Sequence, residues 1–149
     1  RLREGAFSTA FGVADGEPGR VYPLPADDPG FVYPIAQYDH DEGRAIGSGY
    51  VYEGTAIPEL VGKFVFADIV DGRIFYIDTD NLLSGQLQTI YELRLSFAGE
   101  EQALTAVSSF ANSYDDGARV DLRLGTDALG ELYILTKGDG WVRRLLPSD

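Results

Sequence analysis

The chain has no cysteine, no methionine and a single histidine, His40, among its 149 residues. Without cysteine, a disulfide framework, a thiolate metal site and a cysteine nucleophile are all excluded. One histidine excludes any site that needs two imidazoles, including the zinc type with the H-E-x-x-H pattern. The sequence begins Arg1-Leu2-Arg3, without an initiator methionine or an apolar targeting segment. We expect a mature product, a trimmed chain or a fragment.

Positive charge is scarce as well. Only 12 Lys and Arg face 24 Asp and Glu, so the formal net charge is −12. This balance argues against nucleic acid and against an anionic membrane surface as partners. No stretch approaches the roughly 18 apolar residues that a membrane span needs. Hydrophobic residues still make up 44% of the chain, which is ordinary for one folded domain, or two at most.

Residues 1–44 have the composition of a long irregular loop. Prolines interrupt this stretch and exclude a long helix or a central strand; they are Pro18, Pro23, Pro25, Pro29 and Pro34. Aromatic residues are nevertheless scattered through it, at Phe7, Phe11, Tyr22, Phe31, Tyr33 and Tyr38. These aromatic residues predict an ordered loop that packs against the rest of the chain, and a flexible tail is the alternative.

From residue 45 onward, short apolar runs alternate with turn residues. The runs are rich in β-branched and aromatic residues, which predicts strands; they cover residues 50–52, 64–67, 74–77, 89–93, 122–124, 132–135 and 141–145. Asp71-Gly72 and Asp139-Gly140 are predicted to form the turns of two hairpins, because both dipeptides suit positive φ angles. One short helix is expected between Glu100 and Val107.

The two predicted hairpins belong to an internal sequence repeat. Residues 62–77 and 130–145 align without a gap, 68 positions apart, and each copy reads as strand, Asp-Gly turn and strand. Repeated small antiparallel sheets predict the blades of a β-propeller, although two hairpins can also resemble each other by chance.

The prediction is therefore an all-β propeller fragment of about two blades, forming a single partial propeller. We expect the loop at 1–44, one blade at 45–97, a second loop at 98–120 and an incomplete last blade at 121–149. Two blades cannot close a ring of about four to eight. The rest of the ring must come from a larger chain or from a homo-oligomer, in which three copies would supply six blades.

Several segments resemble the glucose/sorbosone dehydrogenase family of six-bladed propellers. Residues 33–54 read YPIAQYDHDEGRAIGSGYVYEG, and the following segments read IPELVGKFVFAD at 57–68 and DGRI at 71–74. The family shares the patterns Y-x-H-x-x-G, Y-V-Y-x-G, P-x-L-x-G-x-Y-V-F-x-D and G-R-I. REG at residues 3–5 and RVDLRLGTD at 119–127 are also similar to family segments. The resemblance covers nearly the whole chain and places it at the C-terminal end of the family's propeller.

This resemblance implies a secreted or periplasmic protein that oxidises sugars with pyrroloquinoline quinone, supported by calcium. The family's catalytic histidine belongs to an earlier blade, so no residue of this chain is assigned as catalytic. Family enzymes hold the carboxylates of the quinone with arginines just before the last blade. Arg119 and Arg123 are the candidates here, although the alignment places Val120 where one such arginine is expected. Some relatives bind partners without known oxidoreductase chemistry.

The remaining candidates have two readings each. His40 lies among three acids that should raise its pKa; it either contacts a sugar at the channel rim or fastens the loop. Arg119 and Arg123 either hold a carboxylate ligand or pair with a nearby aspartate. The four aspartates Asp115, Asp116, Asp121 and Asp127 match no calcium loop, so no metal ligand is assigned. Trp141 either lines a sugar site or belongs to the core between blades.

The sequence thus predicts the C-terminal part of a quinone-dependent aldose dehydrogenase-like propeller that is inactive alone. A propeller module that binds a carbohydrate or a protein without catalysis, and that assembles into a closed ring, is the alternative.

Overall fold

The computed structural model describes residues 9–14, 17–23, 32–38, 41–83, 86–108 and 119–148. The chain divides into two compact units. The first contains Arg1–Gln37 and Asn81–Gln88, and the second contains Tyr38–Asp80 and Thr89–Asp149. None of the helices in the described ranges is long and apolar enough to cross a membrane.

The first unit contains an antiparallel strand pair, β1 (Thr9–Ala14) and β2 (Glu17–Pro23), whose register shifts between Gly12 and Ala14. The prediction of an irregular segment over residues 1–44 is therefore wrong for these strands. Two prolines, Pro18 and Pro23, lie within β2. A two-stranded ribbon has no central strand, so a proline there need not interrupt a ladder on both sides.

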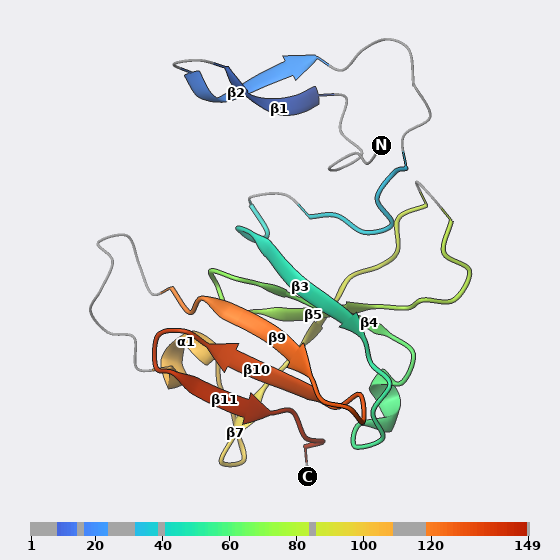
Figure 1. Ribbon diagram of the computed structural model, residues 1–149, viewed down its shortest axis with the longest axis vertical. Coiled ribbons are helices and arrows are strands. Elements are labelled where there is room, and N and C mark those ends of the chain that lie inside the picture. The colour runs from blue at the N-terminus through green and yellow to red at the C-terminus, as the bar shows by residue number, and fades with distance from the viewer. Residues whose placement is uncertain are drawn as a thin grey trace. The chain divides into compact units, whose positions relative to one another are not determined.

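The second unit is built from antiparallel sheets (Figure 1). Sheet one has the order β3-β4-β5-β6, and sheet two has the order β11-β10-β9. The strands of sheet one are β3 (Ile46–Val51), β4 (Phe64–Asp68), β5 (Ile74–Ile77) and β6 (Tyr91–Leu93). Those of sheet two are β9 (Leu122–Thr126), β10 (Leu132–Thr136) and β11 (Trp141–Arg144). These sheets confirm the all-β prediction.

Short elements complete the second unit. The 3-10 turn η1 (Pro58–Leu60) follows β3, and the two-stranded ribbon of β7 (Ser96–Phe97) and β8 (Glu100–Glu101) follows β6. The helix expected between Glu100 and Val107 is confirmed only as the single turn α1 (Leu104–Val107). Residues 100–101 form β8 instead, paired with β7.

The two predicted hairpins are equivalent in backbone conformation. Gly62 and Gly130, which begin the two copies of the repeat, have φ angles of 80° and 78°. Gly72 and Gly140, in the two Asp-Gly turns, have φ angles of 73° and 70°. The repeat read from the sequence is therefore also a repeat of structure, with β4 and β5 matching β10 and β11.

The two sheets pack face to face around one apolar core. Val65, Ala67 and Ile74 of sheet one are buried against a set from sheet two that includes Leu122, Leu124, Leu132 and Ile134. At the sheet edges, β3 lies beside β9, where the Ser48 hydroxyl donates to the Leu124 carbonyl and accepts from the Leu124 N–H.

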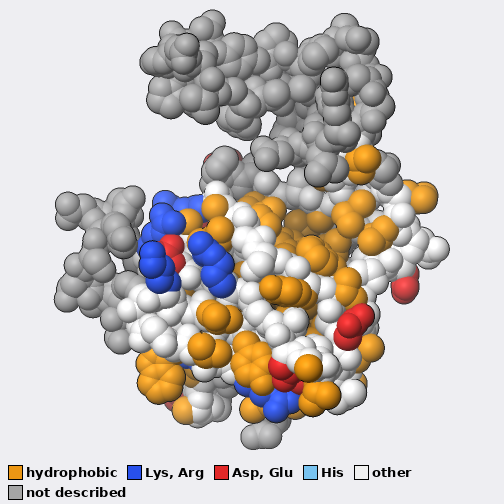
Figure 2. All heavy atoms as spheres, viewed as in Figure 1, with side chains coloured by type: hydrophobic (Ala, Val, Ile, Leu, Met, Phe, Trp, Pro, Cys, Tyr) orange, Lys and Arg blue, Asp and Glu red, His pale blue; other side chains and the backbone are white. Residues whose placement is uncertain are grey.

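The stacking is head to tail. The residues that match Val65, Ala67 and Ile74 in the repeat are Tyr133, Leu135 and Val142. Strand alternation places these three on the face of sheet two that points away from the core. The two sheets therefore meet through unlike faces. Such a contact can repeat from sheet to sheet through the same rotation. Figure 2 shows hydrophobic side chains at the surface over sheet two.

Trp141 departs from the expected core position. Its side chain is 62% exposed on β11, the outermost strand of sheet two, with the Arg143 guanidinium 5.5 Å from its ring centroid.

The two Asp-Gly turns allow a matched stability test. A Cβ at Gly72 would lie 2.9 Å from Cγ2 of buried Val120, whereas one at Gly140 would meet nothing within 4 Å. Gly140→Ala should cost about 1–2 kcal/mol, because it places a side chain at positive φ. Gly72→Ala should cost at least about 1 kcal/mol more, because it also overpacks the core. Urea unfolding at neutral pH measures both, and equal losses would contradict the packing around Val120.

Candidate functional site

A cavity of about 320 Å³ lies where the β4–β5 turn meets the segment after β6. Its volume is at the lower end of the range for small-molecule sites. The polar side chains around it come from Asp71, Arg73, Glu92, Arg94, Glu101 and Gln102. The apolar part comes from Ile74, Leu93, Leu95, Ala103 and Leu104.

Every acidic group of the cavity has an arginine partner. Glu92 accepts two hydrogen bonds from Arg73, at 3.0 Å from Nε and 2.7 Å from Nη2. The hydrogen bonds that Arg73 donates to Glu92 lower the pKa of Glu92 below its ordinary value and raise the pKa of Arg73 above its own. Glu101 lies 3.1 Å from Nη1 of Arg94. Asp71 lies 3.4 Å from Nε of Arg44. Arg44 lies outside the lining, and when it is counted the three carboxylates and three guanidinium groups cancel.

Arg73 is held from three sides. Besides its two bonds to Glu92, it donates from Nη1 to the Glu42 carbonyl at 2.5 Å. Its guanidinium also lies 4.7 Å from the centroid of the Phe75 ring. The β5–β6 register sets Phe75 directly opposite Glu92, so pairing of the two strands brings Arg73 and Glu92 together although 19 positions separate them.

The buried carboxylate of Asp68 fixes the turn that carries Asp71. Its Oδ1 accepts from the N–H groups of Val70 and Asp71, and its Oδ2 accepts from those of Arg44 and Ala45. The hydroxyl of Tyr38 donates to Oδ2 at 3.1 Å. Burial favours the neutral acid, but these backbone donors outweigh it, so the pKa of Asp68 lies below its usual value.

The predicted site residues lie elsewhere. Nε of Arg119 is 2.6 Å from Oδ1 of Asp121, so its contact is the predicted pairing with an aspartate. Arg123 donates from Nη1 to the Leu122 carbonyl at 2.8 Å, and it is exposed on the outer face of sheet two. His40 lies outside the described residues, as do the candidates Asp115 and Asp116.

Arg119, as the structure describes it, fits a quinone carboxylate poorly. A quinone carboxylate at Arg119 would compete with Asp121, which already occupies one edge of the guanidinium. Across the parts of the chain that the structure describes, no group of three or more acids or histidines is arranged to hold a metal ion. No reaction step is therefore derived through either group.

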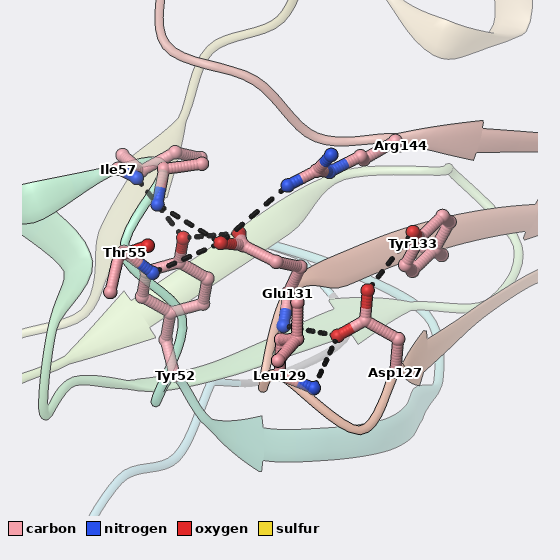
Figure 3. A network of polar contacts seen from close by, with 9 residues as sticks. Tyr52, Thr55, Ile57, Asp127, Leu129, Glu131, Tyr133 and Arg144 are labelled. Atoms are coloured by element: carbon pink, nitrogen blue, oxygen red, sulfur yellow. Dashed lines mark hydrogen bonds and ion pairs between the residues drawn. The ribbon is translucent and has the colours of Figure 1, made fainter.

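A second polar cluster, shown in Figure 3, joins the two sheets. Glu131 is only 3% exposed and accepts from the Tyr52 hydroxyl at 2.7 Å. Its other oxygen accepts from the N–H groups of Thr55 and Ala56 and lies 3.5 Å from Arg144. These contacts satisfy the carboxylate and connect the segment after β3 to the start of β10. The cluster is therefore a structural joint.

Asp127 forms the adjoining part of this cluster (Figure 3). Its carboxylate accepts from the N–H groups of Leu129 and Glu131 and from the Tyr133 hydroxyl. It closes the turn between β9 and β10, so among the candidate calcium ligands it has a structural role.

Sequence reasoning missed Asp68, Glu131 and the Arg73–Glu92 pair. The one available signal was position: Asp68 and Glu131 each stand at the end of a buried apolar run, beside a turn. No model of a known protein family matches the chain, and no solved structure matches it.

The hydrogen bonds of the Glu131 cluster make the free energy of unfolding depend on pH. Hydrogen bonds, first from Tyr52 and then from backbone amides, lower the pKa of Glu131 below its ordinary 4.5. A depressed pKa stabilises the folded state above pH 4.5, and that contribution is lost as the pH falls through the folded value. Glu131→Gln should lower the urea midpoint at neutral pH and flatten its decline in acid.

Glu59→Gln is the matched control, because Glu59 is exposed in η1. It should leave the midpoint nearly unchanged at neutral pH. If Glu131→Gln and Glu59→Gln behaved alike in urea titrations from pH 7 to pH 3, the hydrogen bonds of Glu131 would not contribute to stability as predicted.

Proposed function

We propose that the chain is part of a β-propeller related to the glucose/sorbosone dehydrogenases, and that its second unit binds a small neutral polyhydroxylated ligand, such as a sugar, in the cavity beside β5 and β6. We infer a neutral ligand because the charges around the cavity cancel. An anion would have to displace Glu92 or Glu101, and a cation would have to displace Arg73 or Arg94.

Paired arginine and carboxylate groups suit hydroxyls. A hydroxyl both donates and accepts, whereas a guanidinium only donates and an ionised carboxylate only accepts. An ion pair presents both functions side by side, so neighbouring hydroxyls of one ligand can bind both members without adding charge. The leucines of the cavity provide an apolar surface for the C–H face of such a ligand.

Head-to-tail stacking supports the propeller. Two sheets with equivalent hairpins use opposite faces toward each other, with β3 beside β9 at one edge. Further sheets from a longer chain, or from two more copies of this one, would continue the series to the six that the resemblance implies. A secreted or periplasmic location belongs to the same proposal.

Oxidation of the sugar by a propeller completed with the earlier blades is the second candidate, supported by the resemblance in the segments at 33–74 and 119–127. Pyrroloquinoline quinone and calcium chloride, mixed with the protein, an aldose and a redox dye, would reduce the dye if this chain alone were an enzyme. Neither dye reduction nor a cofactor-dependent rise in melting temperature is expected.

The binding proposal predicts that a substitution at the cavity weakens glucose binding. Arg94→Gln leaves Glu101 without its partner at 3.1 Å, so D-glucose should bind at least about tenfold more weakly, measured by shifts of backbone amide NMR signals. The cationic analogue glucosamine should gain relative to glucose, because the cavity becomes negative.

Lys63→Gln is the control, since it removes the same charge from an ion pair with Asp78 at the opposite end of β4. It should leave glucose binding unchanged. Tighter binding of glucuronate than of glucose to the unaltered protein would contradict a site selected by electroneutrality.

A further inference from the structure

We propose that Tyr76 and Tyr91 form a site of oxidative cross-linking, at which a peroxidase-type one-electron oxidant joins the two rings as dityrosine. This inference depends neither on the ligand of the cavity nor on a propeller. It rests on the pairing of β5 with β6, on the geometry of the two rings and on the path of the chain between them.

The two tyrosines face each other across adjacent strands. Tyr76 of β5 lies directly opposite Tyr91 of β6, and such a pairing sets the two Cβ atoms about 4.5–5.5 Å apart on one face of the sheet. The rings are stacked, with centroids 5.2 Å apart and planes inclined by 20°. Both side chains leave the sheet in the same direction, so the ring carbons next to the two hydroxyls lie at the same end of the stack.

The pair is both restrained and accessible. Tyr76 is partly buried against the apolar core, pairs with Val65 on its other side, and has Nζ of Lys63 5.7 Å from its ring centroid. Tyr91 belongs to the last strand in the order β3-β4-β5-β6 and is 44% exposed. An oxidant in solution therefore reaches Tyr91, while packing holds Tyr76 beside the radical that forms.

The cross-linking step balances with hydrogen peroxide as the final oxidant. Each phenol gives up one electron and one proton to become a phenoxyl radical. The two radicals form one carbon–carbon bond between the carbons ortho to the hydroxyls, and the hydrogens on these carbons move to the oxygens. The protein loses two hydrogen atoms in all, and one hydrogen peroxide is reduced to two waters.

The cross-link would close a loop that passes through the other unit. Residues Asn81–Gln88 belong to the first unit, whereas Tyr76 before them and Tyr91 after them belong to the second. A covalent bond that closes a loop stabilises the fold mainly by restricting the unfolded chain. A disulfide has this effect in other proteins, and this chain has no cysteine but nine tyrosines.

Oxidation of the full chain tests the site. Limiting hydrogen peroxide, added with a haem peroxidase to the dilute protein, should produce the blue fluorescence of dityrosine in a monomer whose mass is lower by two hydrogen atoms. Peptide mapping should place the new bond between Tyr76 and Tyr91. The cross-linked monomer should unfold at a higher urea concentration than the untreated protein.

Tyr91→Phe is the decisive variant, because it keeps a ring for the stack and removes only the hydroxyl that radical coupling requires. It should melt cooperatively and lose the fluorescence of the oxidised monomer. Tyr50→Phe, the matched control in β3, should retain it. The proposal is overturned if the monomer keeps its mass, if the bond maps to other tyrosines, if both variants cross-link equally, or if dityrosine forms only in covalent dimers.

Discussion

The carboxylate of Glu131, buried between two sheets, is the contact on which the second unit depends. A buried charge is tolerated only when several donors satisfy it at once, and here the donors come from the Tyr52 hydroxyl and from two backbone amides of the segment after β3. Tyr52 is itself fully buried and accepts the N–H of Ile57. One acid therefore fixes how the sheets are spaced and how the intervening loop is folded.

Asp68 is a second buried carboxylate that accepts backbone N–H groups. Two of its backbone bonds hold the β4–β5 turn, and the other two attach the segment before β3 to that turn. The turn places Asp71 and Arg73 at the cavity. Both acids lie at the ends of strands, where a change of chain direction leaves amide groups without ladder partners. The apolar core stabilises the sheets, and the buried carboxylates determine how their connections run.

Much of this fold could be predicted from the sequence. The β-branched and aromatic runs gave the strands of the second unit, and Asp71-Gly72 and Asp139-Gly140 gave the hairpins, because their signals are local. The strand pair β1–β2 was missed because the prolines exclude only a long helix or a central strand, and the segment was predicted to be an irregular loop, whereas a two-stranded ribbon tolerates proline. The short helix was placed too early, since Glu100 and Glu101 pair with β7.

The candidate site was less accessible to sequence reasoning. Arg73 and Glu92 meet only through the register of β5 against β6, and register is set by packing that a single sequence does not display. Asp68 and Glu131 look like solvated turn acids until the neighbouring backbone is placed around them. The arginines chosen from the family resemblance, Arg119 and Arg123, have local partners that spacing alone did not distinguish from a ligand.

Head-to-tail stacking has a consequence for solubility. When unlike faces meet, each added unit recreates the surface that the previous one buried, so such a contact either closes into a ring or continues as a filament. A net charge of −12 opposes the filament, since every molecule that joins must overcome the repulsion of those already in line. The same excess of negative charge that argues against nucleic acid as a partner therefore also opposes unlimited polymerisation.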